Sequence, residues 1–213
     1  MAAISVSMFE PTLGKLNQAQ NLLKEGLEIL SSIGARGQVV SLVRGGVPNT
    51  LGILSEFQDV EAYGAGLDRI FSNEGFQQFM ARAQEAEALV PVRSVDYAEI
   101  PGMQVSFEEI ESSGVILATL FKVREGKQEQ SLERIKRSKE LIEKNGGKVR
   151  AMQSISSDPA NLTATAVYFE NFTEYGKSSA ALNNDPDFQA FSAEIRGSDA
   201  SSDFLRTSLY RVL

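Results

Sequence analysis

The sequence predicts an α+β fold built from two copies of one β-α-β-β-α-β unit. The first observation is an internal repeat: Phe9 recurs as Phe121, an offset of 121 − 9 = 112 residues that relates most of the chain without a gap. The second is that strand-like and helix-like patterns follow one another in the same order in both halves. A repeat of this length has the size of a domain rather than of a solenoid unit, which indicates a duplicated folding unit.

An aromatic motif carries the strongest part of the repeat. Tyr63-Gly64 followed by Phe76-Gln77-x-Phe79 recurs as Tyr175-Gly176 followed by Phe188-Gln189-x-Phe191. The two phenylalanines of each copy are three residues apart, a spacing that places both on one face of a helix. We therefore expect them to anchor a helix to the sheet in each half.

Each half begins with a strand and a long helix. Ile4–Met8 alternates apolar and polar residues, as a half-buried strand does, and its counterpart is Val115–Phe121. Apolar residues at helical spacing follow in both halves, and these patterns end at Gly34 and Gly146. Because glycine adopts the left-handed conformation at a helix end at low cost, both helices are predicted to end there.

The middle of each half reads as two strands joined by a turn. Proline and asparagine mark the turns at 47–49 and 158–161. The predicted strands are Gln38–Arg44 and Leu51–Phe57 in the first half, and Lys148–Ser156 and Leu162–Phe169 in the second.

A second helical region, interrupted once, leads to a last strand in each half. The interruptions fall at 72–75 and 183–186, and Asp185 before Pro186 is typical of an N-cap followed by proline at the first helical position. The last strands are expected near Val92–Glu99 and Arg206–Val212. The domain prediction is a first repeat at 1–102, a linker at 103–114 with a short extended piece, and a second repeat at 115–213.

The β-α-β-β-α-β order is that of the ferredoxin-like unit, whose antiparallel sheet has helices on one face only. The other face also needs a cover, and a second copy of the unit provides one. With its tandem units, broken second helix and aromatic motif, the chain resembles the dimeric α+β barrel superfamily, which includes antibiotic biosynthesis monooxygenase-like proteins. The resemblance implies that both repeats form one pseudo-dimeric α+β barrel.

The composition excludes several classes of chemistry. The formal net charge is −7, which disfavours nucleic acid as a partner. No apolar run is long enough to span a membrane, so we expect a cytoplasmic protein, either a monomer or a homodimer. The chain has no cysteine and no histidine. The usual ligands of zinc, iron–sulfur clusters and haem are missing, and the prediction is that the protein uses no metal and no cofactor.

The resemblance also implies a small, apolar or aromatic ligand in the barrel, since members of the superfamily bind or transform such molecules, several without a cofactor. If Ile4, Val6 and Met8 face the helices, alternation places Ser7 and its counterpart Thr119 on the cavity side. Further polar groups on the strands complete the predicted ligand-binding candidates: Ser7, Glu56, Tyr97, Thr119, Tyr168, Arg206 and Tyr210. Glu56 in an apolar cavity could act as an acid or base. The simpler interpretation, which the sequence favours, is that Glu56 lies in solvent at a strand end and that the tyrosines are packing residues.

Two functions follow as alternatives. The first is a small-molecule-binding protein or cofactor-independent enzyme that uses the barrel cavity, with a monooxygenase-like activity as the one that the resemblance implies. The second is a non-catalytic protein that acts in assembly or regulation through its outer surface. A filled barrel would favour the second. Inward positions that differ between the halves, such as Glu56 against Tyr168, favour the first, because one half could keep a pocket that the other fills.

Overall fold

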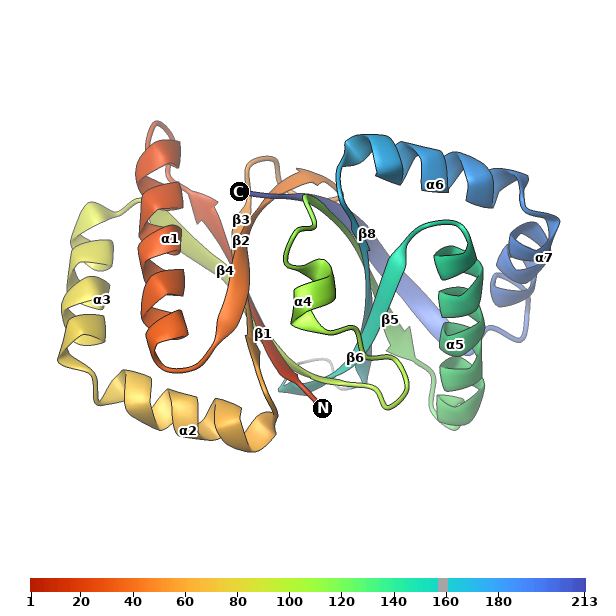
Figure 1. Ribbon diagram of the computed structural model, residues 1–213, viewed down its shortest axis with the longest axis horizontal. Coiled ribbons are helices and arrows are strands. Elements are labelled where there is room, and N and C mark those ends of the chain that lie inside the picture. The colour runs from red at the N-terminus through yellow and green to blue at the C-terminus, as the bar shows by residue number, and fades with distance from the viewer. Residues whose placement is uncertain (157–160) are drawn as a thin grey trace.

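The computed structural model describes residues 1–156 and 161–213. Its strands close into one antiparallel barrel in the order β1-β3-β2-β8-β5-β7-β6-β4 (Figure 1). The bounds of the strands are β1 (Ala3–Pro11), β2 (Arg36–Arg44), β3 (Leu51–Phe57), β4 (Leu89–Glu99), β5 (Val115–Val123), β6 (Lys148–Ser156), β7 (Leu162–Phe169) and β8 (Ser202–Val212).

Each half of the chain contributes one four-stranded sheet to the barrel. The sheets meet at two seams, where β2 pairs with β8 and β4 pairs with β6. Val40 lies opposite Val212 at the first seam, and Glu99 lies opposite Met152 at the second. The prediction of tandem ferredoxin-like units that form one pseudo-dimeric barrel is therefore confirmed.

The helices cover the outside of the barrel, one group on each half (Figure 1). Their bounds are α1 (Leu16–Ser32), α2 (Val60–Phe71), α3 (Glu74–Ala86), α5 (Gln128–Lys144), α6 (Phe172–Asn184) and α7 (Pro186–Ile195). Leu23 of α1, Ile53 of β3 and Phe79 of α3 form part of one buried layer between helices and sheet. None of the helices in the described parts of the chain is long and apolar enough to cross a membrane.

Several local predictions hold. Gly34 and Gly146 follow the ends of α1 and α5 with φ values of 100° and 93°. The side chain of Asp185 accepts hydrogen bonds from the first backbone N–H groups of α7, as an N-cap does. Asn49 and Asn161 share a φ of 65°, a conformation that asparagine tolerates better than most residues. The other residues of the second predicted turn, 158–160, lie outside the described residues.

The segment predicted as a linker instead enters the barrel. It contains the short helix α4 (Phe107–Ile110), which lies inside the ring of strands (Figure 1). Met103, Val105 and Ile110 are buried, the last two in the interior core. Ser106 and Glu109 form a capping box that starts the helix. The apolar residues of this segment therefore close one end of the barrel. The glycines and serines that flank the segment are typical of a linker, so the sequence did not indicate this role.

The repeat is gapless only up to the last strand. Ser7 is hydrogen bonded to Ser94 at 3.0 Å, and the equivalent bond joins Thr119 to Thr207, also at 3.0 Å. Ser7 and Thr119 differ by 119 − 7 = 112 positions, but their partners differ by 207 − 94 = 113. The extra residue lies in the connection between α7 and β8.

Candidate functional site

The inner face of the barrel carries the apolar residues of the first strand. Ile4, Val6 and Met8 line an interior cavity, whereas Phe9 packs in the layer under α1. The predicted orientation of Ser7 is therefore wrong. The ring of strands shields the interior from solvent, so the interior takes the more apolar face, while the helices cover the outer face only in part and leave room for hydroxyls.

Three neighbouring interior positions differ in size between the two halves. In the first half, Val6 lies opposite Leu54 of β3 and Val95 of β4. The equivalent interior positions of the second half hold smaller side chains: Ala118, Ala166 and Ser208. All of these residues line a cavity of about 110 Å³. The cavity thus lies where the second half lacks the side-chain carbons of the first.

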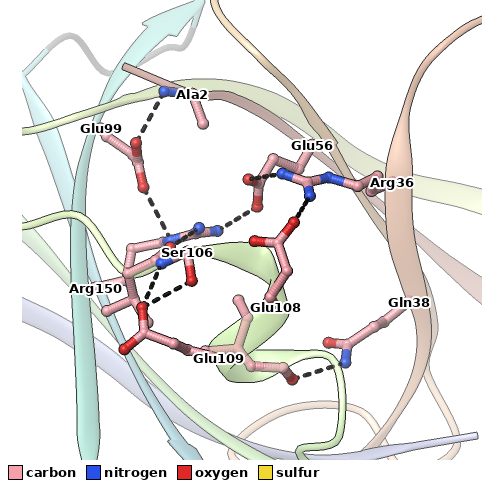
Figure 2. A network of polar contacts seen from close by, with 11 residues as sticks. Ala2, Arg36, Gln38, Glu56, Glu99, Ser106, Glu108, Glu109 and Arg150 are labelled. Atoms are coloured by element: carbon pink, nitrogen blue, oxygen red, sulfur yellow. Dashed lines mark hydrogen bonds and ion pairs between the residues drawn. The ribbon is translucent and has the colours of Figure 1, made fainter.

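A buried ion network closes one end of the barrel (Figure 2). The guanidinium of Arg150 lies 2.7 Å from Glu56 Oε2 and donates a hydrogen bond to the Val105 carbonyl. Its Nε lies 3.1 Å from Glu99 Oε1, an ion pair without hydrogen-bond geometry. The other oxygen of Glu99 accepts a hydrogen bond of 2.8 Å from the backbone N–H of Ala2. The network joins both halves and the segment that carries α4.

The outer side of this closed end has a more open hollow of about 570 Å³, bordered by Arg36, Gln58 and Gln104. The arginine and the two glutamates that border it already have partners. Arg36 lies 3.5 Å from Glu56 and is hydrogen bonded to Glu108, as Figure 2 also shows.

The residues that reach the cavity from its other end include Arg93 of β4 and Arg206 of β8. They occupy equivalent positions, since Met8 lies opposite Arg93 and its counterpart Leu120 lies opposite Arg206. Tyr97 and Tyr210 follow four residues later on the same strands and also line the cavity. This end of the cavity therefore presents two cations from symmetric positions, and the two tyrosines lie further along the strands, at the level of Ile4 and Ile116.

The interior tyrosines are held in their neutral form. Burial raises the pKa of Tyr97, and the charges of Arg93 and Arg206 oppose that rise. Burial also raises the pKa of Tyr168, against the effect of Arg150. Near neutral pH both phenols can donate a hydrogen bond but cannot serve as bases.

The predicted candidate residues fall into two groups. Most line the cavity: Glu56, Tyr97, Tyr168, Arg206 and Tyr210. Ser7 and Thr119 do not point into it. Thr119 borders the cavity, but its hydroxyl is hydrogen bonded to Thr207 and lies on the same face of the strand as Leu117, which packs in the helix-facing layer. Glu56 is buried but does not stand alone in an apolar environment, because Arg150 and Arg36 contact its two oxygens.

The sequence contained a signal for residues that the prediction missed. Arg93-x-x-x-Tyr97 recurs as Arg206-x-x-x-Tyr210, at an offset of 206 − 93 = 113 residues. An offset of 112 residues does not align these two pairs, because the last strand is shifted by one residue. The predicted candidates therefore include Arg206 but not Arg93. Arg150 had no such signal, because its counterpart in the first half is Gln38.

Solved structures share this architecture over the whole chain. A candidate monooxygenase from Fusobacterium nucleatum subsp. nucleatum has a TM-score of 0.67 and 14% identity, covering 100% of this chain and 92% of that one. An anthrone oxidase-like protein has a TM-score of 0.62 and 12% identity, covering 100% and 91%. The chain has the dimeric α+β barrel fold. Protein-family models and curated protein sequences gave no match.

A third similar α+β barrel is a haem-binding protein from Thermus thermophilus, with a TM-score of 0.57, 12% identity and coverage of 100% of this chain and 91% of that one. The residues of the present barrel do not fit haem. The sequence has no histidine or cysteine to serve as an axial ligand. The interior tyrosines could ligate iron, but a cavity of about 110 Å³ has no room for a porphyrin beside them.

Proposed function

We propose that the protein binds a small organic molecule in the interior cavity of its barrel. The observation that carries this proposal is the replacement of Val6, Leu54 and Val95 by smaller residues at all three equivalent positions of the second half. Barrels of this size are normally filled by their own side chains. The loss of side-chain volume at three adjoining positions leaves space for a ligand, and a purely structural barrel would gain stability from filling it.

The size of the cavity limits the ligand. At about 10 to 15 Å³ for each water-sized atom, a cavity of about 110 Å³ holds roughly seven to eleven non-hydrogen atoms. This is below the few hundred Å³ of a typical drug-sized site. The ligand we propose is therefore a single ring or a short chain.

Binding is better supported than acid–base catalysis. Among the described residues, the carboxylate that borders the cavity is Glu56, and Arg150 and Arg36 both contact it. A general base needs an oxygen within hydrogen-bond reach of the substrate's proton. The tyrosines and arginines can orient a ligand without being altered by it.

The test is a triple variant that gives the second half the residues of the first: Ala118→Val, Ala166→Leu and Ser208→Val. A set of compounds with up to about ten non-hydrogen atoms would be screened by ligand-observed NMR. We expect the wild type to bind members of the set and the triple variant to lose them. A ligand at 100 times its Kd should also raise the stability of the wild type by about 2.7 kcal/mol.

Two controls keep this test decisive. Ala81 and Ala193 are exposed on the outer helices, so Ala81→Val with Ala193→Leu should leave binding unchanged. Should the triple variant be overpacked and lose stability, the single variant Ala118→Val replaces it. The proposal fails if the folded wild type binds none of the set, or if the filled variants bind as the wild type does.

A further inference from the structure

We propose that Arg93 and Arg206 together bind the carboxylate of the ligand, so that the cavity is specific for small organic carboxylates with an apolar body. This inference rests on the proposed function and adds the chemical class of the ligand. Its basis is the symmetric placement of the two arginines at one end of the cavity, the lack of partners for them, and the apolar walls beyond them.

A backbone irregularity lies beside each of the two arginines that border the cavity. In the first half the pairing passes from Met8 opposite Arg93 to Phe9 opposite Pro91, so Val92 is an extra residue. In the second half the same shift occurs between Arg206 and Phe204, and Leu205 is extra. A β-bulge re-aims the side chains beside it and is common next to active sites. Both copies of the unit thus carry a bulge directly before an arginine that borders the cavity; Arg93 is half-buried and Arg206 is exposed.

Neither guanidinium has a hydrogen bond or ion pair with a side chain or carbonyl in residues 1–156 and 161–213. By contrast, the arginine at the opposite end of the barrel, Arg150, is held by two carboxylates. The charges of Arg93 and Arg206 both act on the hydroxyl of Tyr97, which places them close to the same point of the cavity. Two like charges at one site repel each other, and a bound anion would neutralise both.

The geometry favours a carboxylate over an inorganic anion. A guanidinium binds a carboxylate through two parallel N–H···O bonds, and two guanidiniums can share its oxygens. Tyr97 and Tyr210 lie four residues further along the same strands, opposite Ile4 and Ile116, and therefore toward the far end of the cavity. Between the arginines and the tyrosines the cavity is bounded by Val6, Ala118 and Ala166, which suit a ring or alkyl chain but offer nothing to a phosphate or sulfate. The ligand therefore has one charged end and one apolar end.

The test compares acids with neutral molecules of the same shape. Benzoate and hexanoate would be titrated into the protein at low salt beside benzamide and hexanamide, with calorimetry or NMR as the readout. We expect each acid to bind at least tenfold more tightly than its amide, and the difference to shrink as salt is added. Inorganic phosphate and sulfate, included as further probes, should bind more weakly than either acid.

Variants assign the effect to the two arginines. Arg93→Gln and Arg206→Gln should each weaken benzoate binding at least tenfold and leave benzamide binding unchanged, and the double variant should remove the preference for the acid. Arg211→Gln is the matched control, because Arg211 is exposed on β8 next to Tyr210 and therefore on the opposite face of the strand. Circular dichroism and thermal melts would establish that each variant is folded.

The outcomes separate this inference from the proposed function. If the amides bind as tightly as the acids, or if the glutamine variants keep the preference for the acids, the carboxylate inference is wrong while the cavity remains a binding site. If phosphate binds more tightly than benzoate, the apolar part of the inference is wrong. If the compound screen gives ligands that are all neutral, the inference also fails. If the screen gives no ligand at all, both proposals fail together.

Discussion

Arg150 of the second repeat and Glu56 of the first form an ion pair inside the barrel, with Arg150 Nη1 lying 2.7 Å from Glu56 Oε2. The repeat itself does not contain this pair. The counterpart of Arg150 is Gln38, and the counterpart of Glu56 is Tyr168. Each half therefore supplies one charge, and the contact exists only when both halves close one barrel. The two ends of the barrel also differ: one is sealed by this network and α4, and the other presents free guanidiniums among the described residues.

Removal of Arg150 should strongly destabilise the protein. Arg150→Ala leaves Glu56 and Glu99 buried without their common partner, and breaking a buried ion pair in this way costs about 3 to 5 kcal/mol. Urea unfolding of wild type and variant gives the difference directly. The control is Arg36→Gln, because Arg36 is half exposed and its pairs at the surface are worth about 0 to 1 kcal/mol. Equal losses for the two variants would contradict the importance of burial here.

The helix inside the barrel gives a second prediction. If 103–114 were only a linker, Ile110→Ala would be nearly neutral. Because Ile110 is buried in the interior core, we expect a loss of about 2 to 5 kcal/mol in the free energy of unfolding. Glu111→Ala, at an exposed neighbouring position, should change stability by less than about 0.5 kcal/mol. Denaturant unfolding of the pair would distinguish a plug from a linker.

The tyrosines predict a loss of stability in alkali. Burial, with a contribution from Asp96, raises the pKa of Tyr63 to about 12, and burial also raises the pKa of Tyr97 and Tyr168. In the unfolded chain tyrosine ionises near pH 10. Above that pH the folded state binds more protons than the unfolded state, so the free energy of unfolding falls as pH rises from about 10 through about 12.

Urea unfolding at about pH 9 and about pH 11, with tyrosinate absorbance of the folded protein, would test this prediction. Tyr63→Phe should reduce the fall in stability, since phenylalanine has no proton to lose. Tyr175→Phe, at the equivalent position of the second half, provides a comparison in which the phenol is hydrogen bonded to Arg44 instead of lying near Asp96. If all tyrosines of the folded protein ionise near pH 10, the interior phenols are not shielded as described.

Much of the fold could be predicted from the sequence because local chemistry marks it. Glycine after the last helical turn, at Gly34 and Gly146, and proline after Asp185 each act within a few residues of chain. The repeat then predicted the barrel, because a β-α-β-β-α-β unit has helices on one face of its sheet and the second unit can cover the other face. The single inserted residue before β8 was missed because few identities support the repeat in the last strand.

The candidate site was harder to predict, because it depends on contacts between segments far apart in the sequence. Alternation along Ile4–Met8 defines two faces of a strand but does not say which one the helices cover. A serine with a hydroxyl partner across the sheet, as Ser7 has in Ser94, is compatible with the outer face. Whether Glu56 has an ionic partner could be decided only by a residue of the other repeat.

The last prediction is that one repeat is not stable alone as a monomer. Residues 1–102 include β1 to β4 but neither strand that completes the seams, so β2 and β4 would become open edges. Ile4, Val6 and Val95 would also lose their cover. At about 25 cal/mol for each Å² of apolar surface, the exposure of several hundred Å² costs on the order of 10 kcal/mol, comparable to the stability of a whole domain. Such a chain should aggregate, stay partly unfolded or dimerise through its two edges to rebuild a closed barrel. Analytical ultracentrifugation and thermal melts distinguish these cases, and a cooperative, stable monomer would contradict the prediction that the closed barrel is the folding unit.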